Sequence, residues 1–227
     1  MTLSAGVHFL EPTIPVHVFE AAEPGPTALI QAGIHGDEIA GVHALQELLE
    51  RGIRPTRGRL LICPIMNPRA YRARQRTGVD GLDLNRCFPG DAEDPAWERR
   101  LARKFMDLVE HERPALMATL HESHKRYDPN ADRPTFGQTL VYGVEPIPAI
   151  IERTVARLNH RFASAQERWD PQYFPVSTSS TEVIVDAIGC VGICVETWMG
   201  FEERHRIEMQ TAVVEYLLDD VGVCGGH

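Results

Sequence analysis

The stretch that decides the fold runs from residue 27 to residue 41 and reads TALIQAGIHGDEIAG. Residues 27–34 are mostly apolar and follow Pro24-Gly25-Pro26, a pattern that predicts a buried strand introduced by a turn. Beyond this strand, apolar residues recur at three-residue spacing and are followed by Gly52. That spacing predicts an amphipathic helix over residues 37–51.

His35 and Glu38 lie on the turn between the predicted strand and the predicted helix. In α/β sheets, ligands gather at the carboxyl ends of strands, and these two side chains are placed there. Imidazole nitrogen and carboxylate oxygen both suit Zn²⁺, and a catalytic zinc has three protein ligands and leaves its fourth position to water. The pair alone is weak, since two polar residues at a helix start look the same. A metal site would need a third ligand from elsewhere in the chain.

Later segments support the metal interpretation. They are Asn67-Pro68-Arg69 with the arginines that follow it, the run DLNRCFPG at residues 83–90, and the apolar segment 115–120, which ends in His121. The apolar run 191–195 predicts one more buried strand, with Glu196 at its end. Polar residues capable of catalysis therefore follow several predicted strands.

This ordered set resembles the zinc carboxypeptidase superfamily, and within it the branch that contains succinylglutamate desuccinylase and aspartoacylase. The resemblance runs from about Thr27 to Trp198. Its motifs are His-x-x-Glu, Asn-Pro, Asp-Leu-Asn-Arg with Phe-Pro-Gly, a strand-ending His and a strand-ending Glu, and they are jointly specific. By this resemblance, His35, Glu38 and His121 would hold one zinc ion per chain.

Glu196 matches the general base of that family, and its residue type agrees with the role. Zinc lowers the pKa of bound water from 15.7 towards about 7, and a carboxylate that is not a ligand can take the proton and pass it to the leaving nitrogen. Asn85 and Arg86 match the carboxylate clamp of the family. Because a planar guanidinium binds a carboxylate through two hydrogen bonds, we expect the substrate to carry a free carboxylate near the scissile bond.

Arg76 matches the arginine that polarises the scissile carbonyl and would help to stabilise the oxyanion. Arg72 and Arg74 lie close by, and only spacing selects Arg76 among the three. Asp83 would be a hydrogen-bond partner of a zinc histidine. These arginines could instead form a patch for an anionic polymer, but the chain is acidic overall.

Two further histidines compete for the ligand positions. His43 follows His35 by eight residues on the predicted helix, and we interpret it as a structural or surface residue. His124 does not have the four-residue spacing from His121 that the helical His-Glu-x-x-His zinc motif requires. We expect it to lie in a loop that could border the pocket.

Composition favours a soluble enzyme. Lys and Arg number 23 against 32 Asp and Glu, and the formal charge of −9 argues against nucleic acid as the main partner. No stretch approaches 18 apolar residues, and the first residues lack a basic segment followed by an apolar one, so we expect no membrane association and a cytoplasmic location. The five cysteines include no Cys-x-x-Cys pair, which predicts reduced, mostly buried thiols.

The remaining elements complete an α/β pattern. We expect an opening antiparallel pair at residues 7–10 and 16–20, a strand at 59–65, helices starting at Asp94-Pro95 and near 147–165 and 202–219, irregular segments at 122–138 and 177–181, and a loose tail at 225–227. Strands that alternate with helices predict a largely parallel sheet covered on both faces. The predicted fold is a single-domain three-layer α/β/α fold with a mixed, largely parallel sheet, similar to zinc carboxypeptidases.

The domain prediction is one zinc-hydrolase catalytic domain over residues 1–227, because the chain is long for one domain and short for two. Aspartoacylases usually carry a C-terminal β-rich domain, and only 31 residues follow Glu196 here, so we expect that domain to be missing. The sequence leaves open whether the chain forms a homo-oligomer.

The expected function is zinc-dependent hydrolysis of a small carboxylate-bearing amide, such as an N-acyl amino acid. The 82 residues between Glu38 and His121 form a short gap, which is similar to the desuccinylase branch. The alternative is a metallocarboxypeptidase or murein-peptide amidase that acts on a short peptide. A catalytically silent metal-binding protein would lack Glu196 or the arginines, and a serine esterase would carry Gly-x-Ser-x-Gly, which is absent from the sequence.

Overall fold

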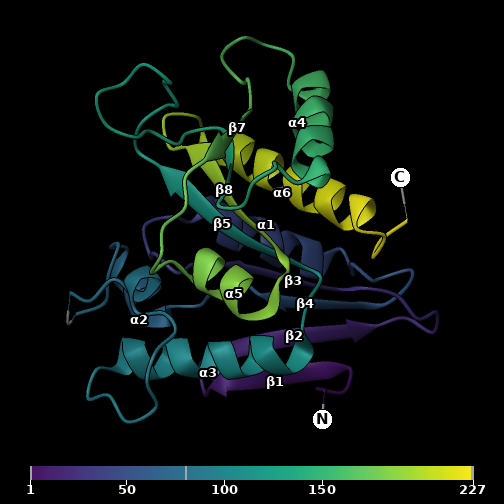
Figure 1. Cartoon of the computed structure of the whole chain (residues 1–227), viewed down its shortest axis with the longest axis vertical. Coiled ribbons are helices and arrows are strands. Elements are labelled where there is room, and N and C mark those ends of the chain that lie inside the picture. The colour runs from purple at the N-terminus through teal and green to yellow at the C-terminus, as the bar shows by residue number, and fades with distance from the viewer. Residues whose placement is uncertain (1, 80, 226–227) are drawn as a thin grey trace.

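One mixed sheet forms the centre of the protein (Figure 1). The computed structural model describes residues 2–79 and 81–225; residues 226 and 227 of the expected tail lie outside them. The strands are β1 Gly6–Glu11, β2 Ile14–Glu20, β3 Thr27–Ala32, β4 Arg59–Cys63, β5 Leu116–Ser123, β6 Thr139–Tyr142, β7 Asp170–Tyr173 and β8 Val191–Trp198. Their order in the sheet is β1-β2-β4-β3-β5-β8-β6-β7.

The central strands β4, β3, β5 and β8 are parallel, whereas β1 pairs with β2, β2 with β4, and β6 with β8 in antiparallel fashion. The sheet is therefore mixed with a parallel centre, as the sequence predicts. The expected antiparallel pair at the N-terminus is confirmed as β1 and β2.

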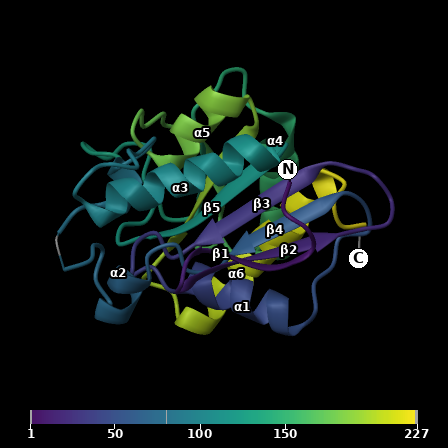
Figure 2. The same cartoon turned by 90° about the horizontal axis from the view of Figure 1, so that it is seen from below.

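Helices cover both faces of the sheet, which gives three layers (Figure 2). The helices are α1 Ala40–Glu50, α2 Pro68–Ala73, α3 Trp97–Glu112, α4 Ala149–Arg161, α5 Ser180–Ile188 and α6 Glu203–Asp220. Alternate residues of β3 point to opposite faces, so Ile30 packs in one core with α1 and α6 while Leu29 packs in the other with α3. Both side chains are fully buried.

The loop between β3 and α1 is longer than the sequence pattern predicts. The strand ends at Ala32 and the helix begins at Ala40 rather than at residue 37. Gly33 takes a positive φ of 64°, and at Gly36 a Cβ atom would lie 2.0 Å from the backbone of Ala70. These two glycines let the chain turn out of the sheet and pass close to α2. Because residues 33–39 form this turn, α1 begins later than predicted.

Two more expectations are wrong in detail. Asp94 and Pro95 precede α3 rather than start it, because the Asp94 carboxylate accepts a hydrogen bond from the Ala96 N–H in a turn of its own. The Ser/Thr run 177–181, expected to be irregular, leads into α5. Ser179 caps this helix by accepting a hydrogen bond from the N–H of Glu182.

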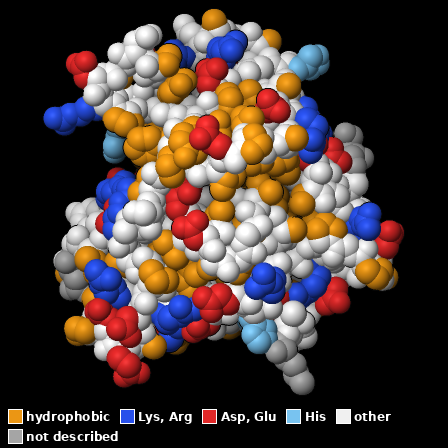
Figure 3. Space-filling view, viewed as in Figure 1, with side chains coloured by type: hydrophobic (Ala, Val, Ile, Leu, Met, Phe, Trp, Pro, Cys, Tyr) orange, Lys and Arg blue, Asp and Glu red, His pale blue; other side chains and the backbone are white. Residues whose placement is uncertain are grey.

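The surface carries both signs of charge. On the face shown in Figure 3, Lys, Arg, Asp and Glu side chains are interspersed, and hydrophobic side chains gather in the upper half. Tyr173 at the end of β7 is one of the exposed large hydrophobic residues. All five cysteines are free thiols, and Cys63, Cys87 and Cys190 are buried. Within the described part of the chain, none of the helices has the length and apolar character needed to span a membrane.

Candidate metal centre

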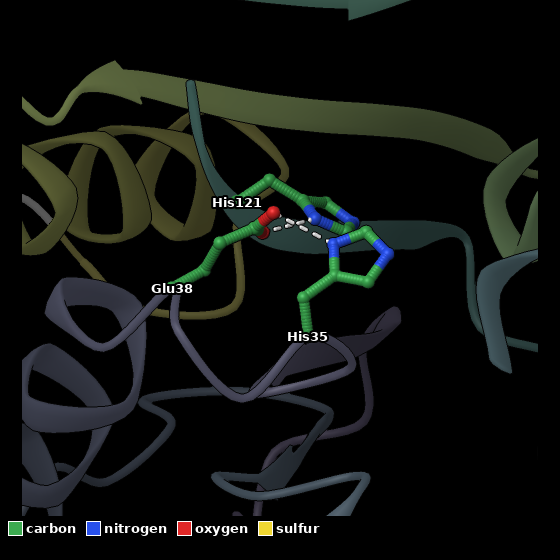
Figure 4. Close-up of side chains that lie close together, drawn as sticks. All are labelled: His35, Glu38 and His121. Carbon is green, nitrogen blue, oxygen red and sulfur yellow. Dashed lines mark hydrogen bonds and ion pairs between the residues drawn. The ribbon is translucent and has the colours of Figure 1, made fainter. Parts of the chain in front are cut away.

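Three buried side chains that can bind a metal ion meet at one edge of the sheet (Figure 4). His35 and Glu38 come from the loop after β3, and His121 comes from β5. Glu38 lies between the two imidazoles: its Oε1 is 2.7 Å from His35 Nδ1 and its Oε2 is 2.6 Å from His121 Nδ1. The ligand atoms of all three residues lie within 4.8 Å of one another.

This donor set fits a metal ion. Two imidazole nitrogens and one carboxylate oxygen form a three-ligand set with one position open, and the ligands of a tetrahedral ion with bonds of about 2.0 to 2.1 Å lie roughly 3.3 Å apart. Both imidazoles present the same atom, Nδ1, to Glu38. The side chains are already gathered on the scale of a single ion, so binding one requires only small shifts.

Neighbouring charges compensate for the burial of the cluster. Burial by itself would raise the pKa of Glu38, but the two histidines outweigh it and hold this pKa well below its usual range. Burial would lower the pKa of His35, but Glu38 and Asp83 outweigh it and raise this pKa to about 9. For His121, burial prevails and the pKa is lowered. The cluster thus behaves as one carboxylate shared by two imidazoles.

Asp83 lies where the sequence resemblance places it. Its Oδ1 is 3.1 Å from His35 Nε2, on the side of the ring opposite Glu38. Its other oxygen accepts hydrogen bonds from the guanidinium of Arg76. A carboxylate on the outer nitrogen of a ligating histidine fixes the tautomer that presents the inner nitrogen to the metal.

The Asn-Pro motif has a structural role near the cluster. The Asn67 side chain is buried and accepts a hydrogen bond from the Ala70 N–H, which caps α2. Helix α2 packs against Gly36, whose N–H donates to the carbonyl of Gln75. The motif therefore fixes the loop that carries His35.

Sequence reasoning missed a second set of supporting residues. Glu122 accepts a hydrogen bond from the Ala40 N–H and forms a buried ion pair with Arg206. Gln210 donates a hydrogen bond of 2.8 Å to the backbone carbonyl of His121. Both contacts link α6 to the strand and loop that hold the cluster. Only the position of Glu122 next to His121 hinted at them.

Glu196 lies beside the cluster without belonging to it. It pairs directly with His121 across the parallel strands β8 and β5, so both side chains project from the same face of the sheet. The sequence placed both at strand ends, but β5 continues to Ser123 and β8 to Trp198. Burial, followed by the charge of Glu38, raises the pKa of Glu196 well above its usual value.

A cavity of about 370 Å³ opens over the cluster. The residues that line it include His35, Glu38, Arg76, Asn85, Arg86, His121 and Glu196, which are all of the site residues expected from the sequence. His124 also lines the cavity, from the loop after β5. His43 does not, and it contacts Glu203 and Tyr71 instead.

The structure distinguishes the three neighbouring arginines. Arg76 lines the cavity, and its Nη1 lies 3.6 Å from Glu38 Oε1. Arg74 takes a left-handed backbone conformation at the end of α2, and its guanidinium lies over the ring of Tyr71. Neither Arg74 nor Arg72 is among the residues that line the cavity. Arg76 is therefore the one of the three that faces the cluster.

Asn85 and Arg86 form one wall of the cavity. The Asn85 side-chain oxygen accepts hydrogen bonds from the N–H and the hydroxyl of Ser180, which ties the short 3₁₀ helix Leu84–Arg86 to the start of α5. This arrangement leaves the amide nitrogen of Asn85 as a donor. Arg86 donates to the backbone carbonyl of Asn85 and keeps further N–H groups for another acceptor.

Comparison with known proteins gives relatives that share this fold. Residues 24–125 match the model of the succinylglutamate desuccinylase/aspartoacylase catalytic domain. An N-alpha-acetyl-L-2,4-diaminobutyric acid deacetylase of Halomonas elongata is 47% identical over 88 residues, which are 38% of this chain and 25% of that protein. The match thus covers about a quarter of the curated relative.

Two solved structures align with most of the chain. A succinylglutamate desuccinylase/aspartoacylase from Rhodobacter sphaeroides has a TM-score of 0.71 at 25% identity and covers 94% of this chain and 60% of its own. The tripeptide-bound cell shape determinant Csd4 from Helicobacter pylori has a TM-score of 0.81 at 18% identity. This alignment covers 93% of this chain and 56% of the Csd4 chain. Residues 24–125 of this chain are therefore similar to the catalytic domain of the succinylglutamate desuccinylase/aspartoacylase family.

Proposed function

We propose that this chain is a zinc-dependent amide hydrolase that cleaves a small carboxylate-bearing amide, such as an N-acyl amino acid. The observation that carries the proposal is one cavity lined by a metal-binding cluster, a carboxylate outside that cluster, and three polar residues suited to binding an anionic substrate. Amide hydrolysis needs each of these groups within reach of one bond.

His35, Glu38 and His121 would hold the ion. Zinc bound there would supply Lewis acidity and bring the pKa of a water ligand close to neutrality. Asp83 keeps His35 in the required tautomer, and Gln210 positions the strand that carries His121.

Glu196 is the proton carrier in this proposal. Its Oε2 atom has no hydrogen-bond partner among the described residues and belongs to a side chain that lines the cavity. Burial raises its pKa, which makes the carboxylate a stronger base than one in water. Glu196 would take a proton from the attacking water and deliver it to the amide nitrogen as the C–N bond breaks.

Arg76 and the clamp residues would hold the substrate. Arg76 directs positive charge towards the space beside Glu38, where the carbonyl oxygen of the scissile amide gains negative charge. Arg86 and the free amide nitrogen of Asn85 would bind the carboxylate of the amino acid product. The cavity volume is at the small end of ligand pockets, which favours a small substrate.

The relatives support an acyl amino acid as the substrate class. The family model is named for a desuccinylase and an aspartoacylase, and the Halomonas elongata protein is a deacetylase. The second candidate is a carboxypeptidase or peptide amidase, since the similar Csd4 structure contains a tripeptide. Both reactions use the same clamp, and they differ in what lies on the acyl side of the scissile bond.

The test is a substrate panel offered to the zinc-loaded protein. We expect hydrolysis of N-acetyl and N-succinyl amino acids, one zinc per chain by elemental analysis, and loss of both metal and activity in His121→Ala. Faster cleavage of C-terminally varied tripeptides would favour the peptidase. Stoichiometric zinc retained at the same site in His121→Ala would contradict the metal assignment.

A further inference from the structure

One carboxylate in the cavity has no role in the chemistry described so far. Glu182, on the first turn of α5, lines the cavity and is only 9% exposed. Its carboxylate has no hydrogen-bond or ion-pair partner among the described residues. A carboxylate with so little exposed surface and no partner is costly to keep charged unless a ligand pairs with it.

The Glu182 side chain does not form the hydrogen bond that its position at the start of α5 predicts. The sequence Ser179-Ser180-Thr181-Glu182 has the Ser-x-x-Glu pattern of a capping box, in which the Glu side chain reaches back to the N–H of the Ser. Here that N–H donates to the carbonyl of Val176 at 2.8 Å. The carboxylate lies instead against Gly143, where a Cβ atom would be 1.8 Å from Glu182 Oε2. The absence of a side chain at Gly143 makes room for the acidic group.

The other cavity carboxylates are already accounted for. Glu38 binds the two histidines of the cluster, and Glu122 is paired with Arg206. Glu196 lies beside the cluster, where the proposed reaction needs it. Glu182 is thus left as an acidic residue of the cavity lining that has no ion-pair partner among the described residues.

We propose that Glu182 is a specificity residue that binds a cationic side chain, an ammonium group, on the amino acid part of the substrate. The inference deepens the proposed function and rests on it. Burial, followed by the charge of Asp186, raises the pKa of Glu182, and a bound ammonium ion would counteract both effects.

The stereochemistry of the substrate supports this assignment. The α-carbon of an N-acyl amino acid bears the amide, the carboxylate and the side chain. The amide belongs at the metal cluster and the carboxylate at Asn85 and Arg86. Because Asn85 is hydrogen-bonded to Ser180 on α5, the wall next to the clamp is the one that carries Glu182. The side chain of the substrate is therefore the group that meets it.

The experiment compares isosteric substrates that differ in charge. The zinc-loaded protein is given Nα-acetyl-L-ornithine, Nα-acetyl-L-norleucine and Nα-acetyl-L-glutamate. We expect kcat/KM to be about 10- to 100-fold higher for the ornithine derivative than for the norleucine derivative. Glu182→Gln should remove most of this ratio and leave norleucine turnover within about threefold. Glu203→Gln is the matched control, because Glu203 lies at the start of α6, contacts His43 and does not line the cavity.

Calorimetry with free L-ornithine and L-norleucine supplies a readout that does not depend on turnover. If no N-acyl amino acid is hydrolysed, the proposed function is wrong, yet ornithine binding that is selective and lost in Glu182→Gln would still support the role of Glu182. Equal hydrolysis of ornithine and norleucine derivatives, preference for the glutamate derivative, or an unchanged ratio in Glu182→Gln would overturn it. Absence of both selective hydrolysis and selective binding overturns it as well.

Discussion

Replacing Glu196 with Gln isolates proton transfer from every other part of the proposed mechanism. The amide has the shape of the carboxylate, so the packing around β8 should persist. The side-chain amide of the variant cannot accept a proton from water, however. Glu196 pairs with His121 across the sheet and lines the cavity, and its Oε2 has no hydrogen-bond partner among the described residues, so it is the carboxylate available to act as the base.

The expected loss follows from the role of a general base. Proton transfer by a positioned side chain contributes about 10²- to 10⁴-fold, which is roughly 2.7 to 5.5 kcal/mol of barrier at 1.36 kcal/mol per tenfold. Folding should be unaffected or slightly favoured, because the substitution removes a buried charge that Glu38 repels. Zinc should stay bound, since Glu196 is not part of the His35, Glu38 and His121 cluster.

The assay measures kcat on the best N-acyl amino acid, together with zinc content and the far-UV circular dichroism spectrum. Glu203→Gln serves as the control, because Glu203 is a carboxylate at the start of α6 that contacts His43 outside the cavity. Turnover within threefold of wild type, with zinc at one per chain, would show that another group is the base. Loss of zinc in Glu196→Gln would instead make Glu196 a ligand.

Three further predictions address recognition, electrostatics and stability. Arg86→Ala should cost about 10- to 150-fold in kcat/KM and shrink the preference for a free carboxylate over its amide; an equal fall for both substrates would exclude the clamp. In chelator, the stability supplied by protonated His35 is complete below pH 6.5 and falls by about 3 kcal/mol as pH rises from 6.5 through 9; urea unfolding that gives a flat profile over this range would refute the pairing. Arg206→Met should destabilise the fold by about 3 to 5 kcal/mol, because it leaves the buried Glu122 carboxylate without its ion-pair partner. In thermal unfolding, Arg206→Met combined with Glu122→Gln should recover much of that loss.

Much of the site was predictable because its residues follow short apolar runs. Such runs in an α/β chain become parallel strands, and strands that lie side by side bring their polar termini together. His35, His121 and Glu196 could thus be placed at one edge of the sheet before their contacts were known. The start of α1 could not be placed, because it depends on the approach of Gly36 to Ala70 across the loop.

Helix α5 was missed although its start carried a signal. The Ser-x-x-Glu pattern at residues 179–182 precedes an apolar run, but a Ser/Thr-rich segment also matches a loop. The pattern alone also gives the wrong destination for the Glu182 side chain, because a capping box would direct it back to the backbone. Only the structure shows that the carboxylate packs against Gly143, 39 residues earlier in the chain, and that Glu182 lines the cavity.

The pairing of β5 with β8 explains how two carboxylates near one metal cluster can have different roles. Glu38 comes from a loop and can turn its carboxylate between the two imidazoles, whereas Glu196 is fixed on a strand that continues to Trp198. Register keeps Glu196 opposite His121 but one strand away from the ligand atoms. The histidines lower the pKa of Glu38, and burial together with Glu38 raises that of Glu196. The same fold therefore produces one carboxylate suited to holding a cation and a second suited to accepting a proton.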